Sequence, residues 1–74
     1  MKVAAGSRIV CPHNHTAGYF QEWIPDGADL YPRHFYINHG VAEKSRVVCE
    51  KCRQTVAQAR HGKWEVRIES GWIA

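Results

Sequence analysis

The sequence contains no long apolar run, no internal repeat and no low-complexity segment. A membrane-spanning helix needs about 20 consecutive apolar residues, and no stretch comes close to that length. The first six residues also lack the apolar core of a secretory signal, and Ser7 and Arg8 follow them. We therefore expect a cytoplasmic protein with no membrane association.

Cysteine is scarce, since the chain has only three. An odd number is a poor basis for a disulfide framework, and clustered cysteines in a reducing cytosol more often hold a metal ion than each other. A chain of this length buries only about 60% of the surface that its unfolded form exposes. It therefore usually needs a metal, disulfides or a partner subunit for stability. These facts predict one small domain stabilised by a metal.

The residues that are abundant indicate a folded chain with one basic half. Three Trp, three Tyr and two Phe are too many for a disordered segment. Residues 44–67 carry seven basic and two acidic side chains, although the net charge of the whole chain is only +3. A basic half of this kind suits nucleic acid or an acidic protein surface.

Short stretches of β-branched and aromatic residues predict a β-rich fold. The expected strands are residues 8–11, 18–24, 34–38, 46–49 and 63–69. Residues 53–61 fit two structures: a helix that ends at Gly62, or a strand that forms a hairpin with the next strand through His61 and Gly62. We favour the hairpin, because the connecting loop is short and a clear strand follows it.

The segment Cys49-Glu50-Lys51-Cys52 is the strongest chemical signal in the sequence. Two thiolates at this spacing can bind one tetrahedral Zn²⁺ ion at about 2.3 Å. A redox pair is one alternative, but the strand and long helix of a thioredoxin-like unit are missing. Two unrelated buried cysteines are another. Cys11 favours zinc, because it also follows a β-branched dipeptide, and two half-sites separated by 37 residues can close one structural site.

The fourth ligand must be a histidine or an acid, because no cysteine is left. We prefer His15, which follows the first cysteine with three residues between them and allows a one-turn knuckle. His13 is the alternative, because residues two apart on an extended strand face the same way. His39 is a more remote candidate, and His34 and His61 are more typical of polar turn residues.

This order of strands and knuckles resembles the zinc-ribbon and zinc-knuckle families. The expected fold is a small β-rich zinc-binding domain with zinc-ribbon-like hairpins and at most one short helix. We expect residues 1–7 to be flexible and residues 8–74 to form the single domain. The sequence departs from the family pattern at two positions. Asn14 stands where the second cysteine of a CPxC knuckle is usual, and Arg53 stands where a glycine usually follows the second knuckle.

We expect no enzymatic activity. A catalytic zinc usually keeps one position open, whereas three cysteines and a histidine are typical of closed structural sites. The contiguous letters of His13, Asn14 and His15 do not match the HNH nucleases, in which the three residues are spread over tens of positions. His34 as a base supported by Asn38 also lacks a suitably placed later histidine. No residue is assigned a catalytic role.

Trp72 needs a separate explanation, because it follows Gly71 after the last clear strand. An apolar segment at this place either folds back onto the sheet or contacts a partner. Most of the other aromatic residues are expected in the core.

The leading hypothesis is a non-enzymatic zinc module that regulates nucleic acid, or nucleic-acid machinery such as a polymerase, by direct contact. Its partner-binding residues would be basic side chains of the second half and one indole. They are Lys51, Arg53, Arg60, Lys63, Arg67 and Trp72. A solvated surface without a partner explains the same charges. The alternative function is a small protein-binding inhibitor or adaptor of the kind that phages and mobile elements encode, without nucleic-acid contact.

Overall fold

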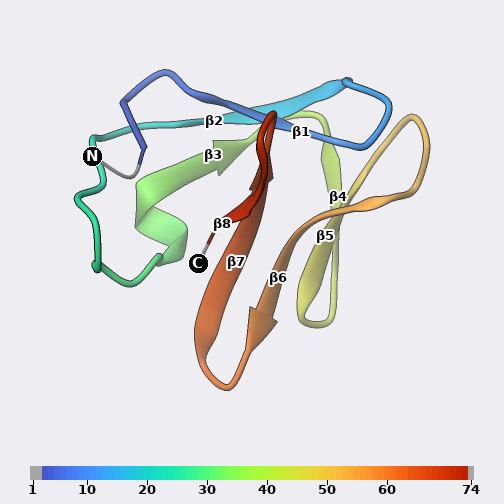
Figure 1. The fold of residues 1–74 in the computed structure, drawn as a ribbon. Coiled ribbons are helices and arrows are strands. Elements are labelled where there is room, and N and C mark those ends of the chain that lie inside the picture. Colours follow the sequence, from blue (N-terminus) through green and yellow to red (C-terminus); the bar gives the residue numbers. More distant parts are fainter. Residues whose placement is uncertain (1–2, 74) are drawn as a thin grey trace.

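The computed structural model describes residues 3–73, and within them the chain forms two antiparallel β-sheets (Figure 1). The first sheet contains β1 (Arg8–Val10), β2 (Thr16–Phe20) and β3 (Phe35–Ile37). The second contains β4 (Gly40–Glu43), β5 (Arg46–Cys49), β6 (Thr55–Arg60), β7 (Lys63–Ile68) and β8 (Gly71–Ile73). Each strand pairs with the next one of its sheet along the chain.

The expected β-rich fold is confirmed. Between β2 and β3 lies a single turn of 3-10 helix, η1 (Pro32–His34), and it is the one helical element of residues 3–73. No helix in this part of the chain has both the length and the apolar character that a membrane span requires.

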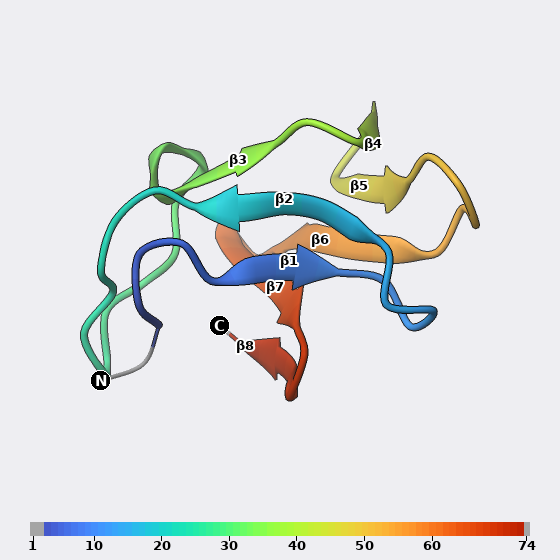
Figure 2. The same cartoon turned by 90° about the horizontal axis from the view of Figure 1, so that it is seen from above.

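One hydrophobic core lies between the two sheets, where β1 packs against β7 (Figure 2). The ring of Trp64 on β7 meets the ring of Phe35 on β3 edge to face, with centroids 5.8 Å apart, and so joins the sheets. Large side chains of this core that are fully buried include Ile9, Phe20, Ile24, Leu30, Val56 and Val66. The apolar residues that alternate along β7 supply its share of the core, as the sequence predicts.

The hairpin predicted for residues 53–69 is confirmed, and the helix considered for residues 53–61 is wrong. Strands β6 and β7 are antiparallel, and Arg60 pairs with Lys63 across a two-residue turn. The turn residues His61 and Gly62 have φ values of 54° and 78°. Positive φ at both positions is what a type I′ hairpin turn requires.

Two strands were not expected, and one begins earlier than expected. Strand β2 starts at Thr16 and ends at Phe20, whereas a strand over residues 18–24 was predicted. Its last expected residue, Ile24, instead forms an isolated bridge with Val3. Strands β4 and β8 lie at the two edges of the five-stranded sheet. Edge strands are short and bury little, so they leave a weak pattern in the sequence.

Residues 3–7 of the segment that we expected to be flexible make defined contacts. Val3 is 3% exposed, and its carbonyl accepts a hydrogen bond from the Ile24 N–H at 2.8 Å. The Gly6 N–H donates to the Phe20 carbonyl, and the Phe20 N–H donates to the Ser7 carbonyl, both at 2.9 Å. The rest of the expected flexible segment, residues 1 and 2, lies outside the described residues.

Candidate metal centre

Two knuckles, one from each sheet, meet at the same end of the molecule. The first follows β1 and contains Cys11, and the second follows β5 and contains Cys49 (Figure 1). The strand register shifts between Ile9 and Val10 in the first case, and between Val47 and Val48 in the second. In each case the additional residue lies on the partner strand, Ala17 on β2 and Val56 on β6, and a bulge of this kind bends the strand that carries it. Both cysteines thus lie at the same place relative to their bulges.

The first knuckle is a tight turn closed by backbone hydrogen bonds. The Cys11 N–H donates to the His15 carbonyl at 3.1 Å, and the Asn14 N–H donates to the Cys11 carbonyl at 2.9 Å. Asn14 has a φ of 64°, in the left-handed region that asparagine tolerates better than most residues. The side chain of His15, which comes directly after this residue, is therefore turned back toward Cys11.

The second knuckle repeats this plan with one more residue. The Cys49 N–H donates to the Gln54 carbonyl at 2.8 Å, and the Arg53 N–H donates to the Cys49 carbonyl at 2.9 Å. Arg53 has a φ of 63°, in the left-handed region that glycine adopts most readily. As a result, Cys52 comes directly before the left-handed Arg53, whereas His15 comes directly after the left-handed Asn14.

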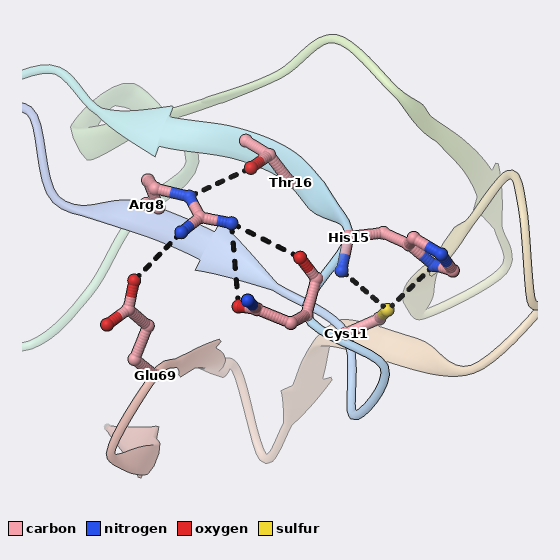
Figure 3. Close-up of polar contacts among 6 residues, drawn as sticks. Arg8, Cys11, His15, Thr16 and Glu69 are labelled. Atoms are coloured by element: carbon pink, nitrogen blue, oxygen red, sulfur yellow. Dashed lines mark hydrogen bonds and ion pairs between the residues drawn. The ribbon is translucent and has the colours of Figure 1, made fainter.

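The two knuckles bring four metal-ligating side chains together. The Cys11 Sγ lies 3.2 Å from the His15 Nδ1, and the Cys49 Sγ lies 3.9 Å from the same nitrogen (Figure 3 shows the first contact). Ligands at about 2.3 Å (sulfur) and 2.1 Å (nitrogen) from a tetrahedral ion are roughly 3.6–3.8 Å apart. The four ligand atoms all lie within 4.8 Å of one another, and we call them the Cys3His cluster: Cys11, His15, Cys49 and Cys52.

No protein-family model matches this chain, and no curated protein or solved structure is significantly similar to it. The metal site is therefore supported by its own geometry and by the chemistry of its donor atoms.

The surroundings of the cluster shift the pKa values of two of its thiols in opposite directions. Burial raises the pKa of the Cys11 thiol, but hydrogen bonds from the His15 backbone N–H, at 3.3 Å, and from neighbouring thiols lower this pKa below its ordinary value. Burial also raises the pKa of Cys52, and the sulfurs of Cys11 and Cys49 add to that rise, against one backbone hydrogen bond at Gln54. A positive ion among the sulfurs would favour the ionised forms of Cys11 and Cys52.

The remaining histidines lie outside the Cys3His cluster. His13 is exposed, and its ring centroid is 6.1 Å from that of His15. The Nδ1 of His39 lies 3.2 Å from a carboxylate oxygen of Glu50. His34 is 8% exposed and accepts a hydrogen bond from the Tyr31 N–H at 3.1 Å, so it is a packed histidine and not a simple turn residue. His61 lies in the β6–β7 turn, as predicted.

An arginine that the sequence did not single out ties the first knuckle to the five-stranded sheet (Figure 3). The Arg8 side chain donates to the Thr16 hydroxyl at 2.8 Å, to the Asn14 carbonyl at 3.2 Å and to the Glu69 carboxylate at 2.9 Å. These partners are 8, 6 and 61 residues away along the chain, so no local pattern predicts the contacts.

The six expected partner-binding residues divide between two places. In antiparallel strands, paired residues point to the same side, and Ala57 and Val66 form a buried pair in the core. The alternate residues therefore point outward, and they include Arg60, Lys63, Arg67 and Trp72. Lys51 and Arg53 lie in the second knuckle instead, and the six residues of β6 separate them from Arg60 by roughly 20 Å.

The outward side of the five-stranded sheet also carries a basic residue that we did not predict. Arg46 pairs with Gln58, which pairs in turn with Glu65, and this row lies beside the Arg60–Lys63 pair. We call the outward residues Arg46, Arg60, Lys63, Arg67 and Trp72 the basic face.

Proposed function

We propose that the Cys3His cluster binds one structural Zn²⁺ ion and that the domain it stabilises is a non-enzymatic binding module. Three thiolates and one imidazole are a donor set of structural zinc sites. The donor atoms lie close enough together to share one tetrahedral ion, and the His15 N–H directed at the Cys11 sulfur is typical of the groups that surround bound thiolates.

A structural role is favoured over a catalytic one. The protein itself supplies four ligands, so a tetrahedral ion would have no position left for water or substrate. Two of the sulfurs are almost completely buried, with Cys11 2% exposed and Cys49 1% exposed. The ligands come from both sheets, so a bound ion would hold the two sheets together.

We propose nucleic acid as the partner, and the basic face is the observation that supports this. It carries four basic side chains against two acidic ones, Glu43 and Glu65, on the same side of the sheet. Arg46 lies 2.9 Å from Glu43, Arg60 lies 3.8 Å from Glu65, and Lys63 lies 3.8 Å from Asp29. Such exposed ion pairs contribute little to stability, so phosphate groups can take the place of the carboxylates. No acidic partner of Arg67 is found among residues 3–73.

Salt dependence of binding tests the proposal. Affinity for DNA or RNA should fall with rising salt, by about 0.7–0.9 log units per log unit of salt for each phosphate contact. Arg60→Gln and Lys63→Gln should each weaken binding to all sequences and reduce the slope by about one contact. Lys44→Gln, in the β4–β5 turn, is the matched control and should change affinity little. An absence of binding to any single- or double-stranded probe at low salt would refute the proposal.

A protein partner is the second candidate, and a different surface favours it. Tyr19 and Tyr36 pair across β2 and β3 on the outward side of the three-stranded sheet. They are 43% and 55% exposed, so the two rings form an aromatic patch that the fold does not need for its core. Capture of a host protein that survives nuclease treatment, and that Tyr36→Ala abolishes, would support this function.

A further inference from the structure

We infer that the basic face binds single-stranded nucleic acid, with an unpaired base stacked on Trp72 and phosphate groups on Arg67 and on the Arg60–Lys63 pair. The inference rests on the proposed nucleic-acid partner and adds the class of nucleic acid and the residue that recognises it.

The indole of Trp72 is partly exposed on the surface, where it can contact a ligand. It is the central residue of β8, an edge strand, and it is 43% exposed. Its neighbour Ile73 packs against the core, so the indole lies on the opposite, outward side. The core has its own tryptophan on this sheet, Trp64, which meets Phe35. Stacking on bases is a role that suits an indole which the core does not require.

The neighbours of the indole supply the charge that a nucleic-acid backbone needs. Arg67 pairs with Trp72 across β7 and β8, so a cation and an aromatic ring lie side by side. Lys63 is four residues from Arg67 on the same face of β7, which corresponds to about 13 Å. A strand of nucleic acid that follows β7 would therefore place its phosphates near cations at both ends of this segment.

The shape of the face favours a single strand over a duplex. Five strands about 4.8 Å apart make a sheet roughly 19 Å across, which is wider than the major groove of about 12 Å. Residues 3–73 contain no α-helix that could enter a groove. Bases in a duplex are already stacked on each other, whereas unpaired bases are free to stack on aromatic side chains.

The other exposed aromatic surface is less suitable for this ligand. Tyr19 and Tyr36 belong to residues 3–39, which carry three acidic and two basic side chains. One of these two bases, Arg8, is already paired with Glu69 at 2.9 Å. Charge complementarity to phosphate therefore points to Trp72 and not to the tyrosines.

Fluorescence anisotropy with two labelled probes tests the inference. The probes are an oligothymidine of about 12 nucleotides, within the site sizes of small single-strand binders, and a duplex of the same length. The zinc-loaded wild type should bind the single strand more tightly. Trp72→Ala should weaken single-strand binding by roughly 5- to 150-fold and should change duplex binding little. Trp72→Tyr should retain most of the affinity.

Trp23→Ala is the matched control, because Trp23 is 53% exposed but lies in the segment after β2, outside the five-stranded sheet that carries the basic face. It should leave both affinities within about twofold of the wild type. Trp72→Leu keeps an apolar side chain on the sheet without a ring, so it separates stacking from folding and should lose affinity as Trp72→Ala does.

Equal affinity for the two probes, or single-strand binding that survives in a folded Trp72→Leu protein, would overturn the inference and leave the proposed nucleic-acid partner intact. Binding to neither probe would refute the proposed partner itself.

Discussion

At the scale of residues, each knuckle contains one residue other than glycine in the left-handed region. Asn14 and Arg53 both have φ values near +60°, and the N–H of each donates to the carbonyl of the first cysteine of its knuckle. Asparagine visits this region at modest cost, but an arginine there is strained by about 1–2 kcal/mol.

Replacing Arg53 by glycine should therefore stabilise the zinc-loaded protein. The relief of strain exceeds the additional entropy that glycine gives to the unfolded chain, so we expect a gain of about 0.5–1 kcal/mol in the free energy of unfolding. Urea denaturation measures it. Asn14→Gly is the matched control and should gain less. A less stable Arg53→Gly protein would show that the arginine side chain contributes more than its backbone strain costs.

His15 and His13 should differ clearly when each is replaced by alanine. The structure brings the Nδ1 of His15 to 3.2 Å from the Cys11 sulfur, whereas His13 is exposed and lies outside the Cys3His cluster. We expect His15→Ala to lose most of the bound zinc and His13→Ala to retain one ion per chain. Elemental analysis of the purified variants decides, and loss of zinc from His13→Ala alone would show that the wrong histidine has been assigned.

Zinc binding should weaken as the pH falls. The raised pKa of Cys52 means that this thiol carries a proton at neutral pH in the metal-free protein, and bound zinc must displace it. Because the metal-bound form holds fewer protons, its stability is present at higher pH and is lost on acidification. Chelator competition between pH 8 and pH 6 should show about a tenfold loss of affinity per pH unit for each proton released. Constant affinity over that range would mean that the thiols are already ionised without metal.

At the scale of elements, two neighbouring residues of β8 are expected to have different roles, one in the stability of the domain and one in the proposed binding of nucleic acid. Ile73 packs against the core, whereas Trp72 lies on the outward side. Truncation after Ser70 should keep zinc and a cooperative transition but lose up to about 2 kcal/mol, which lowers the melting temperature by roughly 10 °C. Trp72→Ala alone should change it by only a few degrees. A truncated protein with no thermal transition would make β8 essential to the core.

The sequence predicts the three inner strands of the five-stranded sheet and misses its two edge strands for a physical reason. Strand β7 buries one face, so its apolar residues alternate visibly, and His61-Gly62 provides a recognisable hairpin turn. Strand β4 has no fully buried residue and β8 has only three residues, so neither leaves such a pattern. Strand β2 extends through the small residue Ala17 toward the first knuckle, which its aromatic half did not reveal.

The candidate site was easier to predict than the surface. The spacing of Cys49 and Cys52 is a local property, and Cys11 follows a β-branched dipeptide as Cys49 does, so these three members of the Cys3His cluster could be proposed from the sequence, with His15 as the preferred fourth. The choice between His13 and His15 depends on the backbone of the turn, which the left-handed Asn14 determines. The separation of Lys51 and Arg53 from the basic face, like the contacts of Arg8, depends on strand pairing and could not be predicted from charge alone.

At the scale of the whole molecule, a metal ion bound by the Cys3His cluster would cross-link the two sheets. Cys11 and His15 come from the hairpin of β1 and β2, and Cys49 and Cys52 come from the hairpin of β5 and β6. A structural zinc ion contributes about 10–16 kcal/mol of apparent binding energy, which is comparable to the entire stability of a small domain. The metal should therefore determine whether the two sheets stay together.

Metal content measured together with folding tests this account most directly. Protein purified without added metal should contain one zinc ion per chain and show a cooperative thermal transition by circular dichroism. A strong chelator should remove the ion and abolish the transition, and one equivalent of Zn²⁺ should restore both. A purified sample that is folded, unfolds cooperatively and contains no metal would contradict the account.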